Sequence, residues 1–108
     1  MTNRHLASIT LLGLLSLSLA NCTSTYTDIC TKEKDCEGGN DKDVDACIER
    51  LRGQEDVAAA YDCSDAFDKA LDCAESTATC KDKNFATECK SQNDALESCT
   101  EAASGTGK

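Results

Sequence analysis

Near its start the chain has a run of apolar and small uncharged residues. No charged side chain occurs between Leu6 and Leu19, and a short head containing Arg4 and His5 precedes the run. Its 14 residues are fewer than the roughly 20 that a helix needs to cross the hydrocarbon of a bilayer. A charged head, a short apolar run and small residues after it are typical of a secretory signal peptide. We therefore expect residues 1–21 to be a signal peptide.

Further along the chain, apolar positions recur at intervals of three and four, which is the spacing of one helical face. The pattern predicts three helices, which span about residues 43–52, 54–74 and 85–103. Gly53 is expected to end the first helix, since glycine accepts the left-handed conformation that terminates helices. Asn84 is expected to cap the third. Strand signals are weak, because Ala, Glu, Lys, Asp and Leu dominate over β-branched and aromatic residues.

The segments that flank these helices are short. Residues 22–29 are predicted to form a polar tether, residues 75–83 a turn and residues 104–108 a flexible tail, so the domain covers residues 30–103. Large apolar side chains are few, with two Phe, two Tyr and no Trp in the whole chain. Disulfides must therefore supply much of the stability. We expect a small all-α fold, either a disulfide-stapled helical hairpin or a three-helix domain.

The predicted signal peptide runs into the tetrapeptide Leu19-Ala20-Asn21-Cys22. It resembles the lipobox of bacterial lipoproteins, in which the cysteine receives a diacylglyceryl thioether and becomes the mature N-terminus. Asn21 departs from the Gly, Ala or Ser that usually precedes the cysteine. The resemblance implies lipidation of Cys22 and a membrane anchor. Thr23 differs from the Asp that resembles an inner-membrane retention signal in enteric bacteria, which favours anchoring at the outer membrane.

A second cleavage site competes with this interpretation. Ser18-Leu19-Ala20 fits the small-x-small rule of ordinary signal peptidase, and cleavage after Ala20 would release a free secreted protein. The number of cysteines bears on the choice. The chain has nine, and setting Cys22 aside as the lipid carrier leaves eight, which can close four disulfides in an oxidising compartment. Parity therefore favours the lipidated form.

The cysteines of the body recur in a repeated form. An acidic residue and a cysteine are followed, after nine or ten residues, by a second cysteine and a Glu two positions further on, as at Cys36 and Cys47, Cys63 and Cys73, and Cys89 and Cys99. The second and third units resemble the twin C-x9-C motif of coiled-coil-helix-coiled-coil-helix proteins, in which two disulfides join antiparallel helices. The resemblance implies the bonds Cys63–Cys99 and Cys73–Cys89.

Two further bonds would then form among Cys30, Cys36, Cys47 and Cys80. A rival arrangement remains open, because Cys47–Cys63 and Cys36–Cys73 would be nearly level across a turn at Gly53. The two arrangements place different helices side by side, since the rival makes a hairpin of the first two predicted helices.

The charge balance limits the choice of partner. The chain contains 20 acidic and 11 basic residues, and loss of the leader would remove Arg4. Such an acid excess argues against nucleic acid and anionic lipid head groups as partners. It favours solubility, or attraction of a cationic partner.

Residues suited to catalysis are scarce. The only histidine is His5, inside the leader, so the mature chain offers no Ser-His-Asp or Cys-His site and no histidine metal ligand. There is no C-x-x-C motif, which argues against a redox centre and a zinc knuckle. Asp41, Asp43 and Asp45 copy the first ligands of a calcium loop, but the glycine and terminal acid of such a loop are missing. We expect no metal and no cofactor.

These observations favour a cysteine-rich lipoprotein of the bacterial envelope that acts as a structural or binding module and not as an enzyme. Its contacts would be the membrane, through the N-terminal lipid, and another envelope protein. The alternative is a freely secreted cysteine-rich binding protein, such as an inhibitor or effector.

Overall fold

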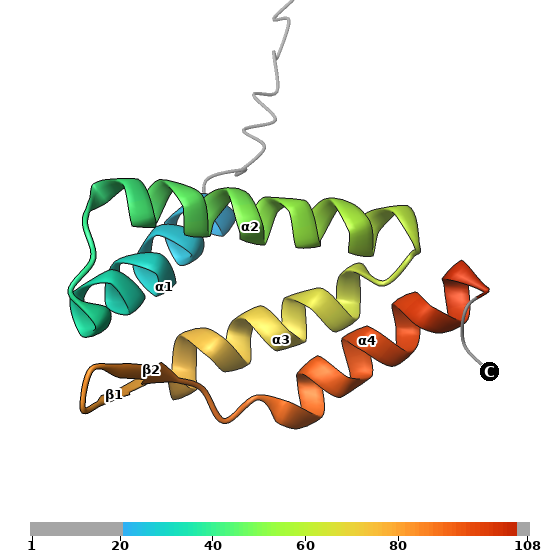
Figure 1. The fold of residues 1–108 in the computed structure, drawn as a ribbon. Coiled ribbons are helices and arrows are strands. Elements are labelled where there is room, and N and C mark those ends of the chain that lie inside the picture. Colours follow the sequence, from blue (N-terminus) through green and yellow to red (C-terminus); the bar gives the residue numbers. More distant parts are fainter. Residues whose placement is uncertain (1–20, 106–108) are drawn as a thin grey trace, which may run out of the picture.

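Two helical hairpins, α1–α2 and α3–α4, make up most of the part of the chain that the structure describes, residues 21–105 of a computed structural model (Figure 1). A small β-hairpin connects the two helices of the second hairpin. The elements in chain order are α1 (Asn21–Glu37), α2 (Asp41–Ala60), α3 (Ser64–Thr77), β1 (Thr79–Lys81), β2 (Asn84–Ala86) and α4 (Lys90–Ser104). This confirms the predicted small all-α fold held by disulfides.

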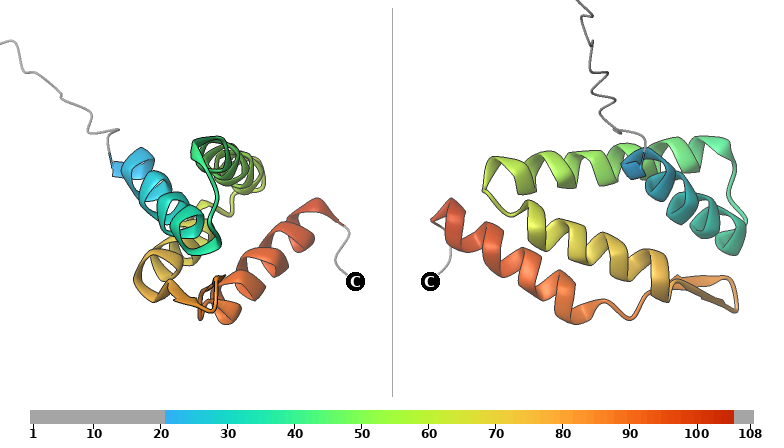
Figure 2. Two further views of the ribbon diagram at one scale, coloured as in Figure 1. Left: turned by 60° about the vertical axis from the view of Figure 1, so that its left-hand side comes forward. Right: turned by 180° about the vertical axis from the view of Figure 1, so that it is seen from behind.

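Four disulfides determine how these elements are held together. Cys30–Cys47 joins α1 to α2, and Cys63–Cys99 and Cys73–Cys89 join α3 to α4. Cys36–Cys80 connects the end of α1 to β1 and so ties the first helical hairpin to the second. The structure thus contains both bonds that the twin motif implies, and neither bond of the rival arrangement. The views from two further directions show α1 and α4 on opposite sides of the α2–α3 pair (Figure 2).

Residues 22–29 differ from the predicted polar tether, because they belong to α1. Tyr26 and Ile29 are buried, with 2% and 5% of their surfaces exposed. With Cys30 they form a stripe at offsets of three and four, which packs on the other helices. The Tyr26 hydroxyl donates a hydrogen bond of 2.8 Å to Oε2 of Glu55 in α2. The chain is therefore anchored to the core one helical turn after Cys22.

Gly53 does not end a helix, contrary to prediction. α2 continues through it to Ala60, and a Cβ placed on Gly53 would meet nothing within 4 Å. An interior glycine costs a helix only about 1 kcal/mol, and the burial of Ala58 beyond it offsets that cost. The helix ends instead where Asp62 adopts a left-handed φ of 56°.

The third predicted helix begins later than expected. Residues 79–86 form an antiparallel hairpin in which Cys80 pairs with Phe85, and α4 starts only at Lys90. Asp82 and Lys83 both have positive φ, 51° and 61°, which is the conformation of a tight type I′ hairpin turn. Asn84 therefore lies in β2 and caps no helix, so that prediction was wrong.

The core lies where the first helical hairpin meets α3. Tyr26, Ile29, Ala58, Phe67 and Leu71 are buried there with Cys63. The rings of Tyr26 and Phe67 meet edge to face, with centroids 6.4 Å apart, a favourable arrangement for aromatic pairs. No residue of α4 between Lys90 and Ser104 is fully buried. The outermost helix is thus held mainly by its disulfides to α3.

Candidate functional site

The cysteines predicted as disulfide partners are brought together in a structural role. Seven of the eight half-cystines are at least partly buried: Cys30, Cys36, Cys47, Cys63 and Cys89 almost completely, and Cys73 and Cys99 in part, while Cys80 is exposed. All eight are oxidised, so none is a thiol nucleophile or a thiolate ligand. The ninth, Cys22, lies in the first turn of α1, but its side chain and residues 1–20 lie outside the described part of the chain.

The segment at the start of α2 that resembles a calcium loop, with Asp41, Asp43 and Asp45, caps the helix. The Asn40 side chain accepts a hydrogen bond from the Lys42 N–H at 2.9 Å, and Asp43 accepts one from the Asn40 N–H at 2.8 Å. This capping box satisfies the first backbone donors of the helix. Within residues 21–105 no group of three or more His, Cys, Asp or Glu side chains could hold a metal ion. No helix of that range is long and apolar enough to cross a membrane.

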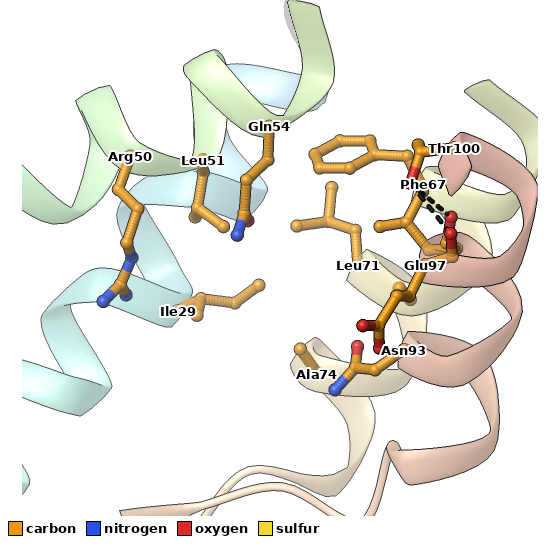
Figure 3. Close-up of a pocket in the computed structure, with 12 residues that line it drawn as sticks. Ile29, Arg50, Leu51, Gln54, Phe67, Leu71, Ala74, Asn93, Glu97 and Thr100 are labelled. Carbon is orange, nitrogen blue, oxygen red and sulfur yellow. Dashed lines mark hydrogen bonds between the residues drawn. The ribbon is translucent and has the colours of Figure 1, made fainter. Parts of the chain in front are cut away.

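The feature with the geometry of a binding site is a groove between α2 and α4 of about 550 Å³ (Figure 3). Its floor is made by apolar side chains of α3, and Ile29 extends toward them from α1 (Figure 3). One wall is α2 and the other is α4. The lining residues are Ile29, Arg50, Leu51, Gln54, Phe67, Ala70, Leu71, Ala74, Asn93, Leu96, Glu97 and Thr100. We call this the α2–α4 groove.

The groove continues along α2 toward the end of that helix. A shallower depression of about 370 Å³ shares Arg50, Gln54, Leu96 and Thr100 with it and adds Gly53 and Val57. Val57 is half exposed, at 50%. Since α2 rises about 1.5 Å per residue, the wall from Arg50 to Val57 is roughly two helical turns long.

The groove exists because its two walls belong to different hairpins. Among the four disulfides of residues 21–105, Cys30–Cys47 ties α2 to α1, and Cys63–Cys99 and Cys73–Cys89 tie α4 to α3. None of the four joins α2 to α4. The facing surfaces of α2 and α4 also carry few large side chains. Leu96 is the only large apolar residue of α4, and Gly53 leaves open space on α2. The two helices therefore cannot close over the floor.

Polar groups line the rim of the groove, and some of them already form ion pairs or hydrogen bonds within the protein. The Arg50 guanidinium is bound to Glu33 of α1 at 3.1 Å. The Thr100 hydroxyl donates to the backbone carbonyls of Leu96 and Glu97, at 3.2 and 3.0 Å. Glu97 is exposed and forms no ion pair within the described residues. The groove therefore combines an apolar floor with a negatively charged outer rim.

Comparison of the sequence with models of known families and with curated proteins, and of the structure with solved structures, gives no match. The groove could not be found in the sequence, because its lining comes from four helices whose relative placement is set by the disulfides. The only local signal for it is the pattern of Leu51, Gln54 and Val57, which places polar and apolar residues together on one exposed face of α2.

Proposed function

We propose that this protein is a lipid-anchored binding module of the bacterial envelope, and that its binding surface is the α2–α4 groove. The groove carries the proposal, because its volume of about 550 Å³ and its apolar floor with a few polar rim groups are typical of binding sites. The module acts by contact and turns over no substrate. The missing histidine in the mature chain and the oxidised state of the eight cysteines of the body support this part.

Sequence and cysteine use support anchoring at Cys22. The tetrapeptide at residues 19–22 resembles a lipobox, and all the other cysteines pair with one another in four disulfides. Exported proteins rarely leave an odd cysteine without a role. A diacylglyceryl thioether with an added acyl chain would anchor stably, because each buried methylene contributes about 0.8 kcal/mol. We place the protein at the outer membrane of a host that has one.

The fold bears on how such a protein would be displayed. Because α1 begins at Asn21, a lipid on Cys22 would hold the domain within about one helical turn of the bilayer. α1 and α4 lie on opposite sides of the molecule (Figure 2). The groove beside α4 would therefore remain open to other envelope proteins while α1 lies near the membrane.

Intact mass and fractionation of the mature protein test the anchor. Wild type is expected to begin at Cys22, to carry the mass of the acyl chains and to sediment with membranes. Cys22→Ser should become soluble, whereas Asn21→Ala, which restores a usual lipobox residue, should stay lipidated. A mature protein that begins at Asn21 without lipid would favour the secreted alternative.

The binding role has a separate test. A photo-cross-linking residue in place of Val57, on the groove, is compared with one in place of Lys81, an exposed residue at the β-hairpin tip. We expect a discrete cross-linked product from intact cells at the groove position alone. Equal products at both positions, or none at either, would contradict a groove-centred binding function.

A further inference from the structure

We propose that the α2–α4 groove receives a cationic amphipathic helix of a partner protein. This inference rests on the proposed function and names the chemistry of the partner. Its apolar part follows from the shape of the groove. Two helical walls over a floor that includes Phe67 and Leu71 match the way an amphipathic helix lays its apolar side chains into a groove.

The length of the groove sets the size of the contact. The lined stretches run from Arg50 to Val57 on α2 and from Asn93 to Thr100 on α4, about two helical turns each. A bound helix would present apolar residues at positions i, i+3, i+4 and i+7 over that length. Leu51, Leu96 and Val57 are the exposed or half-buried residues that would contact them.

The charge around the groove determines which sign of charge a partner helix must carry. Along the α2 wall, residues 50–57 hold two acidic and two basic side chains, whereas residues 93–101 of the α4 wall hold three acidic residues and no lysine or arginine. Glu97 lies on the rim, and Glu101 follows it one turn later on α4. The one basic residue of the lining, Arg50, is offset by Glu33. An incoming cationic helix would therefore be attracted, and an anionic one repelled.

The backbone reinforces this charge. α2 and α4 both finish at the same end of the molecule, at Ala60 and Ser104 (Figure 1). The C-terminus of a helix carries a partial negative charge, which a cation nearby stabilises. Neither helix has a basic residue in its last turn. Both partial charges are thus left for a partner to compensate.

The test uses the full processed protein in detergent and a synthetic amphipathic peptide of roughly 14 residues, the usual length of a protein helix. The first peptide has leucine on one face and lysine on the other. A second has glutamate in place of lysine, and a third has serine in place of leucine. We expect the Leu/Lys peptide to bind, and each of the others to bind more than about tenfold more weakly.

Two pairs of variants locate the binding site. Gly53→Leu fills the groove, whereas Ala59→Leu adds the same bulk on the opposite, exposed face of α2. Glu97→Gln with Glu101→Gln removes two charges at the rim, and Asp72→Asn with Asp82→Asn removes two exposed charges elsewhere. The first member of each pair should weaken binding more than about tenfold, and the second less than about twofold.

Several outcomes would overturn the inference. If both charge variants lose the same affinity for the Leu/Lys peptide, the attraction to the acidic protein is non-specific. If the Leu/Glu peptide binds as tightly as the Leu/Lys peptide, charge plays no part. Binding of a neutral apolar compound, with no peptide binding, would reassign the groove to a small ligand. If the peptide fails while the cross-linker at position 57 still captures a partner, the inference is wrong and the proposed function stands.

Discussion

Removal of the Cys36–Cys80 disulfide is expected to have the largest effect on stability of any single bond in the fold. This bond encloses the longest loop, with a sequence separation of 44, against 36, 17 and 16 for the others. In the chain-entropy model a loop of that size contributes about 4 kcal/mol, and the two shortest about 3 kcal/mol each. It is also the only one that joins the two helical hairpins.

The double variant Cys36→Ala/Cys80→Ala should therefore lose about 4 kcal/mol of its free energy of unfolding. For a domain of this size that loss corresponds to a fall in melting temperature on the order of 20 °C. The remaining disulfides still hold α1 to α2 and α3 to α4. Helical circular dichroism at low temperature should thus persist, while the unfolding transition becomes broader because the hairpins are coupled only through the apolar core.

Urea denaturation followed by circular dichroism measures the loss, with Cys73→Ala/Cys89→Ala as the matched control. The control removes a bond inside one hairpin and should cost about 3 kcal/mol without separating the hairpins. A loss below about 1 kcal/mol for the first variant would refute the reasoning. Contacts such as Tyr26 against Phe67 would then be sufficient to hold the two hairpins together.

Three smaller changes test individual contacts. Gly53→Ala should stabilise the protein by about 0.5–1 kcal/mol in thermal or urea unfolding, because α2 is helical there and nothing obstructs the added methyl group. Tyr26→Phe should cost about 1.5–3 kcal/mol in the same assay, since it leaves Glu55 without a hydrogen bond from the hydroxyl. Asp94→Asn should lower the pKa of Lys90, which NMR titration can follow, because the hydrogen bond from Lys90 to Asp94 and the charge of Asp94 raise that pKa. The Lys90–Asp94 ion pair holds only while Lys90 is protonated, so its contribution is lost as the pH rises through that pKa.

The helical fold could be predicted because the helix-favouring composition and the spacing of apolar residues pointed the same way. Phe67 and Leu71 lie four apart on α3 and are both buried, as the periodicity indicates. The bonds Cys63–Cys99 and Cys73–Cys89 were implied by the resemblance to the twin C-x9-C motif. In that motif the interval from Cys63 to Cys73 has the same length as the interval from Cys89 to Cys99. Equal spacing places both bonds level across one antiparallel hairpin, so one alignment of the helices satisfies both.

The missed elements depend on contacts distant in the sequence. α1 carries Thr and Ser residues at many positions, and its buried stripe becomes apolar only when a half-cystine and Tyr26 are counted with Ile29. The β-hairpin turn contains no glycine, although Asp82 and Lys83 both adopt positive φ. Such a turn is favoured here by the bond from Cys36 to Cys80, which holds β1 against α1. The groove depends on the same long-range bonds.

Disulfide bonding also explains how a small domain can keep an apolar groove open. If α4 were held by burial alone, stability would increase as Leu96 and the floor beneath it were covered, and the same force would close the groove. A disulfide stabilises mainly by restricting the unfolded chain, and this contribution does not require apolar surface to be buried. Cys63–Cys99 and Cys73–Cys89 fix α4 on α3 although no residue of that helix is fully buried. The wall of the groove is thus held in place before any partner arrives, and binding loses less conformational entropy than it would on a mobile helix.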